Sequence, residues 1–421
     1  MTDQSSRRFI RPLRDFLATE AAGGFAVVVG AVLALVWANS PWRESYTALW
    51  GTELRIGLGD VDFGLDLRHW VNEGLMTLFF LVVGMEIKRE VVEGELRDRR
   101  LRVLPIASAL GGMALPALIY LLINYGGPSA EGWGIPMATD VALAVGVLAL
   151  AGRIPNSLKL FLLSLAIADD VGAIIVIAVF YGAGGNAWGL VGIVAVIAAV
   201  IALQRFGVES VLPYVGLGVI LWICLRWAGV HGTIAGVILG LLAPTKPMVE
   251  RQLVDLESLD PDSVEAVMTS SRLVRGTVSV VERMEYRLHG WSSYLVVPLF
   301  ALANAGIHLG APGEALASTV GLGVAVGLVA GKPIGILLFA WLATRLRIAR
   351  LPTGTHWGQL VGVGLLAGIG FTVSLFIAEL ALAEPSLTIA KTAILAASLL
   401  AAIAGLAVLR IGINRHSMLE P

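Results

Sequence analysis

Charged residues and cysteine are both scarce in this sequence. Only 14% of its 421 residues are charged, against about a quarter in soluble proteins. The single cysteine, Cys224, excludes a disulfide framework and a cysteine-ligated metal centre. A net charge of −1 argues against a nucleic-acid partner, and the lack of a phosphate-binding loop argues against an ATP-driven pump. Hydrophobic residues make up 57% of the chain, more than a soluble core can bury, so the sequence predicts a membrane protein with no cofactor.

Apolar runs of about 17–25 residues, long enough to cross a bilayer as helices, recur along the chain. They predict an all-α polytopic protein of about twelve transmembrane helices that forms a single domain over residues 1–421. The first run follows Arg7 and Arg8, which resemble a twin-arginine signal, but its length favours a retained helix. The expected spans are 18–38, 70–87, 103–124, 134–151, 158–181, 187–204, 209–226, 229–243, 291–308, 317–344, 357–380 and 388–411.

Most of the 30 basic residues fall at the N-terminus or after every second span. This bias predicts that both termini are cytoplasmic and that the membrane is the bacterial inner membrane. The periplasmic loop 39–69 alternates around Gly59-Asp60, which indicates a small β-hairpin. Because a lone hairpin is marginal in water, it either pairs with a second copy of the chain in a homodimer or is an ordinary extracellular hairpin. The other long loop, 244–290, is expected to be cytoplasmic.

Few ionisable residues are predicted to lie at bilayer depth, where they are costly and usually functional. They are Asp140, Asp169, Asp170 and Lys332. Glu379 and Lys391 also fall near spans, but close to the outer ends, where we expect their side chains to snorkel to the interface.

Asp169 and Asp170 are adjacent in the middle of a span. Neighbouring side chains on a helix point about 100° apart, so both carboxylates can border one cavity. Carboxylate oxygens suit hard cations, and two buried carboxylates disfavour full ionisation. The pair can therefore hold protons or a cation such as Na⁺, but hardly both, which is the property an exchanger needs. The alternative is a pair of buried acids neutralised by Arg or Lys.

Two spans carry signs of an interrupted helix. In the first, Pro136 precedes Thr139 and Asp140, and this carboxylate can offset the positive ends of helices within the membrane. In the second, a glycine-rich stretch leads into Phe371-Thr372. Paired interruptions in two halves of a chain point to a transporter binding site. A proline-kinked helix and glycines that allow close packing are the alternatives.

Lys332 is the only basic residue expected at mid-span. A lysine at this depth needs a carboxylate partner or loses its proton. Asp169 or Asp170 is the obvious partner, but Lys332 can instead neutralise the C-terminal ends of broken helices. The sequence leaves both roles open.

Seven stretches spread over nearly the whole chain closely resemble, in order, the NhaA family of bacterial sodium/proton antiporters. They are Phe79-Phe-Leu-Val-Val-Gly-Met-Glu-Ile-Lys-Arg-Glu90, Trp133-Gly-Ile-Pro-Met-Ala-Thr-Asp140, Leu165-Ala-Ile-Ala-Asp-Asp-Val-Gly172, Gly229-Val-His231, Pro298-Leu-Phe-Ala-Leu-Ala-Asn-Ala-Gly306, Gly331-Lys-Pro-Ile-Gly335 and Gly368-Ile-Gly-Phe-Thr-Val-Ser374. The resemblance implies inverted repeats of helices 3–5 and 10–12, with helices 4 and 11 broken and crossed.

The resemblance also implies roles for individual residues. Asp169 and Asp170 would bind Na⁺ and protons. Thr139, Asp140, Lys332 and Thr372 would lie at the helix breaks and compensate their dipoles, and Lys332 would pair with Asp169. Glu86, Lys88, Glu90, His231 and Glu285 match positions linked to pH response, although ordinary solvated charges remain the alternative. The implied activity is a pH-regulated, electrogenic exchange of Na⁺ or Li⁺ for more than one H⁺ by alternating access, in a secondary transporter and not an enzyme.

Two other functions fit the sequence less well than ion exchange. A sodium-coupled symporter of an organic anion would need a further basic pocket, whereas Lys332 already serves the aspartates. An intramembrane aspartyl protease would need its two aspartates on different helices, but here they are adjacent.

Overall fold

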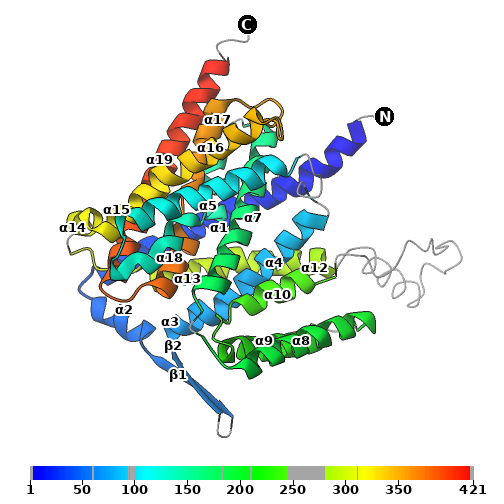
Figure 1. Cartoon of the computed structure of the whole chain (residues 1–421), viewed down its shortest axis with the longest axis vertical. Helices are drawn as coiled ribbons and strands as arrows, with labels where there is room; N and C mark the ends of the chain where they lie inside the picture. The colour runs from blue at the N-terminus through cyan, green and yellow to red at the C-terminus, as the bar shows by residue number, and fades with distance from the viewer. Residues whose placement is uncertain are drawn as a thin grey trace, which may run out of the picture.

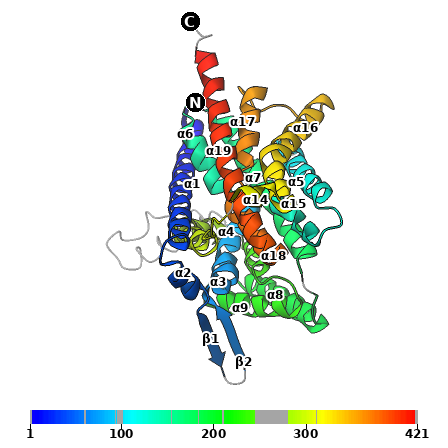
Figure 2. The same cartoon turned by 90° about the vertical axis from the view of Figure 1, so that its left-hand side faces the viewer.

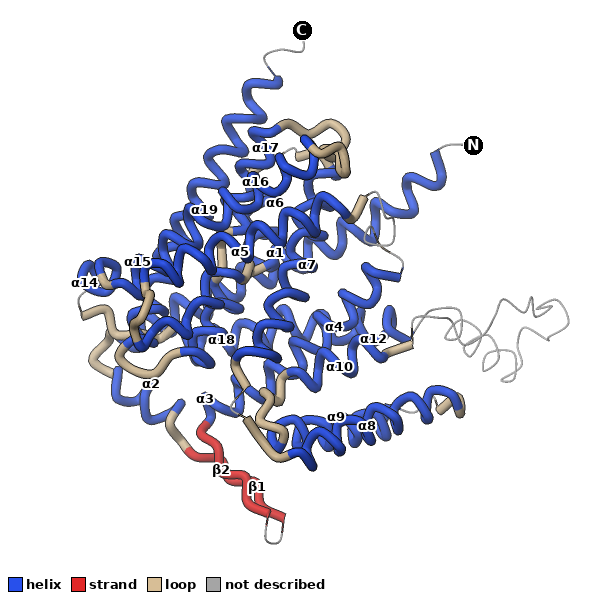
Figure 3. Tube along the Cα trace, viewed as in Figure 1, coloured by secondary structure: helices blue, strands red, loops and turns tan. Residues whose placement is uncertain are grey.

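The chain is built almost entirely of helices, with one small hairpin (Figures 1 and 3). The computed structural model describes residues 3–58, 61–92, 94, 101–152, 154–182, 184–208, 211–244, 280–310 and 312–417, so Gly59, Asp60 and most of the 244–290 loop lie outside it. The elements of the first half are α1 (Asp3–Ala38), α2 (Arg43–Trp50), β1 (Glu53–Leu58), β2 (Val61–Asp66), α3 (Leu67–His69), η1 (Trp70–Leu75), α4 (Met76–Val92), α5 (Val103–Ile123), η3 (Pro128–Met137), α6 (Val141–Leu150), α7 (Asn156–Phe180), α8 (Ala187–Arg205), α9 (Val211–Trp227) and α10 (Ile234–Leu242). Those of the second half are α12 (Val280–Trp291), η5 (Ser292–Val296), α13 (Val297–Asn304), α14 (Pro312–Ala317), α15 (Thr319–Val326), η6 (Gly327–Gly331), α16 (Lys332–Arg345), α17 (Trp357–Ala367), α18 (Phe371–Ala381) and α19 (Ser386–Ser417).

Each of the twelve apolar runs expected from the sequence coincides with helix in the structure. In the described part of the chain, six continuous helices and two bent pairs are long and apolar enough to cross a membrane. The remaining runs form shorter helices, of which α10 has nine residues. This helix begins at Ile234 and not near 229, because Gly229 takes a positive φ of 73° that ends the preceding helix in a turn.

The hairpin predicted in the first long loop is present. Strands β1 and β2 pair antiparallel from Glu53↔Asp66 to Leu58↔Val61, so they flank the predicted turn residues Gly59 and Asp60, which lie outside the described residues. The hairpin projects from one end of the molecule, whereas α1 begins and α19 ends towards the opposite end (Figures 1 and 2).

Two triplets of helices have the same order of a long, a bent and a long helix. The first is α5, η3–α6 and α7; the second is α15–α16, α17–α18 and α19. The bends are 45° between η3 and α6 and 43° between α17 and α18. The triplets pack through α5 and α16, where a Cβ on Gly111 or Gly335 would meet the carbonyl oxygen of the other at 2.2 or 2.1 Å. Only glycine permits this backbone contact.

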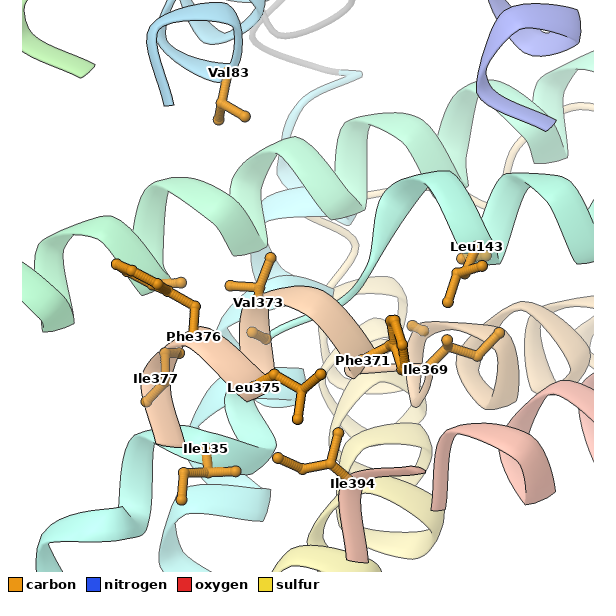
Figure 4. Close-up of a cluster of buried hydrophobic side chains, with 14 of the residues drawn as sticks. Val83, Ile135, Leu143, Ile369, Phe371, Val373, Leu375, Phe376, Ile377 and Ile394 are labelled. Carbon is orange, nitrogen blue, oxygen red and sulfur yellow. The ribbon is translucent and has the colours of Figure 1, made fainter. Parts of the chain in front are cut away.

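The buried core surrounds the second bent pair (Figure 4). The side chains of Ile377, Leu375 and Phe376 project from α18, and Ile135 of η3 and Ile394 of α19 lie against this part of the helix. The ring of Phe376 also lies 5.5 Å from that of Phe80 in α4. This packing fixes α18 against both its own triplet and the other half of the protein.

Candidate ion-binding site

The two helix interruptions meet inside the protein. The backbone N–H of Asp140 donates to the carbonyl of Ile369 at 2.6 Å, which joins the break after η3 to the break after α17. The hydroxyl of Thr139 lies 2.9 Å from the carbonyl of Ala367, the last residue of α17. Ala138 and Asp140 have extended backbones, so neither η3 nor α6 can continue through the break. The structure thus contains the pair of crossed, interrupted helices expected from the sequence.

Asp140 binds the N-terminal ends of both helices that leave the crossing. Its Oδ1 accepts from the backbone N–H of Leu143 at 3.0 Å and caps α6. Its Oδ2 accepts from the N–H and the hydroxyl of Thr372, at 3.1 and 2.6 Å, in the first turn of α18. A buried carboxylate here satisfies orphan donors and offsets two positive helix ends at once.

Lys332 is fully buried and makes both contacts that the sequence left open. Its ammonium lies 2.6 Å from Oδ2 of Asp169 and also donates to the carbonyl of Met137, at the C-terminal end of η3. The π-helical turn η6 ends immediately before it, as such turns often do at functional sites. Of the two aspartates, Asp169 is therefore the ion-pair partner, and the same amine neutralises the end of a broken helix.

The two oxygens of Asp169 are in different situations. Oδ2 accepts from Thr139 at 2.7 Å as well as from Lys332. Oδ1 is buried and has no hydrogen-bond partner among the described residues. A buried carboxylate oxygen with free lone pairs is costly without a proton or a cation, so Asp169 keeps one oxygen able to bind either.

Asp170 borders a cavity of about 50 Å³ and has no hydrogen-bond partner in the described part of the chain. Thr139, Asp140 and Thr372 also line this cavity. The lining also includes Glu86, His289, Ser292 and Ser293, among apolar residues. The cavity thus links Asp170 to a carboxylate near the end of α4. Sequence reasoning missed His289, Ser292 and Ser293, although His289 follows Glu285 by one helical turn, a spacing that could have indicated a shared face.

The residues matched to a pH response fall into two groups. Glu86 lies 3.7 Å from His289, and Glu285 forms an ion pair of 2.6 Å with Arg89. Lys88 and Glu90 lie on the same stretch of α4; Lys88 donates to Leu241 O at 2.9 Å and Glu90 accepts from Ser164 at 3.3 Å. Four of the five matched residues therefore lie around the C-terminal end of α4.

His231 lies apart from that group. Its Nε2 donates to the carbonyl of Tyr181 at 2.8 Å, and its charged neighbours are Glu73 and Arg226. Glu73 precedes Glu86 by thirteen residues of nearly continuous helix, about 20 Å at 1.5 Å per residue. Burial lowers the pKa of His231 below its usual 6.5. Any role of His231 in pH response therefore acts from the opposite end of α4.

The snorkelling expected of Glu379 and Lys391 is wrong. The two side chains form an ion pair of 2.5 Å, and Lys391 is buried. The helices α18 and α19 pack together, which places the amine against the carboxylate instead of the membrane interface. Lys332 is therefore not the only buried lysine of the protein.

Among the described residues, no group of three His, Cys, Asp or Glu side chains is arranged to hold a metal ion. The donors that converge on the crossing are carboxylates, a hydroxyl and carbonyl oxygens, the ligands that alkali cations prefer. A helical protein whose interrupted helices cross beside buried carboxylates has the architecture of an ion transporter.

Comparison with known proteins identifies the family. Residues 14–409 match the family described as Na⁺/H⁺ antiporter 1, and the chain belongs to it. The Na⁺/H⁺ antiporter NhaA of Rhodopirellula baltica is 46% identical, covering 96% of this chain and 94% of that protein. The antiporter NhaA 2 of Sorangium cellulosum is also 46% identical, covering 96% and 91%. The resemblance found in the sequence is thereby confirmed.

A solved structure shares the fold. The sodium proton antiporter MjNhaP1 from Methanocaldococcus jannaschii matches with a TM-score of 0.51 over 96% of this chain and 98% of that chain, at only 13% identity. The protein is thus a multi-pass bacterial membrane protein of a family that exchanges Na⁺ for H⁺.

Proposed function

We propose that this protein is a secondary active antiporter that extrudes Na⁺ or Li⁺ in exchange for more than one H⁺. The observation that carries the proposal is the arrangement of two adjacent carboxylates at the helix crossing. Asp169 is paired with Lys332, while Asp170 borders a cavity without a hydrogen-bond partner in the described residues. One carboxylate is held by a cation of the protein, and the other is left for a cation from outside.

Proton binding and Na⁺ binding compete for these groups. The ionised set of Asp169, Asp170 and Lys332 carries a net charge of −1, so one Na⁺ neutralises it as well as one proton does. When Na⁺ draws Asp169 away from Lys332, the buried amine loses its partner and favours release of its own proton. Asp170 and Lys332 can therefore each give up a proton for one Na⁺.

Such a stoichiometry is electrogenic. With more than one proton moving in for each Na⁺ moving out, the membrane potential drives extrusion by about 2.3 kcal/mol per net charge per 100 mV. The ion-binding site at the helix crossing is then open first to one side of the membrane and afterwards to the other. The helices η3–α6 and α17–α18 carry the residues that cap and support the site, so their displacement together with α7, which carries both aspartates, moves the site.

The proposal also covers the pH regulation of exchange and the position of the protein in the membrane. The cavity joins Asp170 to Glu86, so we place the cytoplasmic access path along the end of α4, with Glu86, Lys88, Glu90 and Glu285 setting its charge. Exchange stops when the cytoplasm is acidic, because the carboxylates of the site then stay protonated. The basic residues favour an inner-membrane protein with both termini in the cytoplasm, and β1–β2 favours a homodimer through the periplasmic hairpin.

The test is proton flux in inside-out vesicles, with a ΔpH-sensitive dye and added Na⁺, Li⁺ or K⁺ at several pH values. We expect Na⁺ and Li⁺ but not K⁺ to dissipate ΔpH, increasingly as pH rises. Asp170→Asn should abolish the response, whereas Glu314→Gln, which removes an exposed carboxylate in α14, should leave it intact. Full exchange by Asp170→Asn would overturn the assignment. No cation response from folded wild type would favour a sodium-coupled symporter instead.

A further inference from the structure

A second, much larger cavity lies away from the candidate ion-binding site. It has a volume of about 570 Å³ and separates the α8–α9 pair from α4 and α10. Its walls are almost entirely apolar and include Leu78, Leu81, Val200, Val215, Val219 and Leu239. In Figure 1 the α8–α9 pair lies alongside α10, at the edge of the helix assembly.

Polar contacts attach the α8–α9 pair to the rest of the protein at both ends of this cavity. At one end Arg226 of α9 forms an ion pair with Glu73 of η1. At the other, Gln204 of α8 donates from Nε2 to the carbonyl of Leu242 at 2.8 Å. Between these contacts few side chains of α8 are buried, and in the described part of the chain α8 packs chiefly on α9. The ends are thus attached while the middle is left apart.

A cavity of this kind must be filled. It is partly open to the surroundings, and its exposed apolar walls lose dispersion contacts unless an apolar group packs against them. Water is a poor occupant, because it needs two to four polar partners and apolar cavities stay dry.

The surroundings indicate what the occupant is. The outer faces of α8 and α9 expose large apolar side chains, including Val194, Leu212 and Ile220. Apolar faces of this kind suit the hydrocarbon of the bilayer, and the cavity lies between these two helices and the pair α4 and α10. A slender apolar chain from the bilayer can enter a partly open cavity of about 570 Å³ with apolar walls.

We propose that this cavity is a binding site for one acyl chain of a bilayer phospholipid, which packs the α8–α9 pair against α4 and α10. The headgroup stays at the membrane surface, and the site recognises the chain by shape and apolarity alone. The lipid thus supplies the packing that protein side chains provide elsewhere in the fold.

Two neighbouring glycines of α9 offer a matched pair of variants. A Cβ on Gly218, which lines the cavity, meets only the mobile end of Leu239, at 2.8 Å, so Gly218→Phe extends a ring into the cavity. Gly216 is exposed and has nothing within 4 Å of such a Cβ, so Gly216→Phe adds the same ring towards the membrane. Both replace glycine within the same helix and carry the same change in helix propensity.

The experiment uses the full-length protein in vesicles containing a phosphatidylcholine with a photoreactive diazirine midway along one acyl chain. Cross-linked residues are mapped by mass spectrometry. In the wild type we expect labelling of Leu81 and Leu239 inside the cavity, as well as Leu212 on the outer face. Displacing two methylenes costs about 1.6 kcal/mol, so Gly218→Phe should lower cavity labelling relative to Leu212 by about tenfold. Gly216→Phe should leave this ratio unchanged.

Labelling confined to outer-face residues such as Leu212 in the wild type would overturn the proposal. Equal labelling of Leu81 and Leu239 in both variants would do the same. Retained Na⁺-dependent proton flux in both variants establishes that they are folded.

Discussion

Thr372 donates both its backbone N–H and its hydroxyl to a single oxygen of Asp140, across the crossing of the two interrupted helices. The other oxygen of Asp140 caps α6. One carboxylate therefore holds the N-terminal ends of two helices, although Asp140 and Thr372 lie 232 positions apart in the chain. The crossing depends on this bridge, because each helix end alone would leave orphan donors in the membrane.

Removing the hydroxyl of Thr372 should weaken the bridge. Thr372→Val keeps the shape but deletes a hydrogen bond to a charged group, which is worth about 1.5–3 kcal/mol. We expect a lower thermal unfolding midpoint in detergent and slower Na⁺-driven proton flux. Thr372→Ser, which keeps the hydroxyl, serves as the control. Equal stability of the Val and Ser variants would show that the backbone N–H alone supports the crossing.

Losing Lys332 should leave Asp169 as a buried charge without its partner. Lys332→Gln is expected to destabilise the protein by about 3–5 kcal/mol, the usual cost of breaking a buried ion pair from one side. The double variant Lys332→Gln with Asp169→Asn removes both charges and should regain most of that stability, as measured by thermal unfolding. A double variant as unstable as the single one would mean that the contact of Lys332 with Met137, and not the ion pair, carries the stability.

The pair of Glu379 and Lys391 should matter for stability and not for exchange. Glu379→Gln leaves Lys391 buried without its counter-ion, and we expect a loss of about 3–5 kcal/mol. Glu379→Gln combined with Lys391→Gln should be closer to the wild type. The Na⁺ concentration for half-maximal proton flux should stay unchanged in the double variant, because the pair lies outside the cavity of the candidate ion-binding site. A changed Na⁺ response would give this pair a part in the access path.

His231 should make the protein less stable in acid. Since burial lowers its pKa in the folded state, the unfolded chain binds more protons below the usual value of 6.5. Its contribution to stability is therefore complete above pH 6.5 and falls as the pH drops towards the folded-state pKa. His231→Gln keeps a donor for the Tyr181 carbonyl without titrating. We expect unfolding midpoints of wild type and variant to diverge between pH 7.5 and 5.5, with the variant losing less, and parallel curves would contradict this.

Much of the fold could be predicted because segments that lie in the membrane have a distinctive, strongly apolar sequence. A helix that crosses hydrocarbon needs a long apolar run, so all twelve runs coincide with helix in the structure. The paired interruptions were also readable, since Pro136 and the glycines before Phe371 break helices for local reasons. Charged side chains in the middle of a membrane cost free energy and are rare. For this reason the sequence also indicated Asp140, Asp169, Asp170 and Lys332.

Hydropathy and helix breaking are local properties, so the amino-acid pattern specifies a helical membrane protein with charged groups at depth. The resemblance implied the pairing of Lys332 with Asp169, but most of the contacts between these groups depend on the tertiary fold. It paired Lys332 with both Asp169 and Met137, buried Lys391 against Glu379, and separated His231 from Glu86. These outcomes depend on how helices distant in sequence pack side by side, and spacing along one chain does not contain that information.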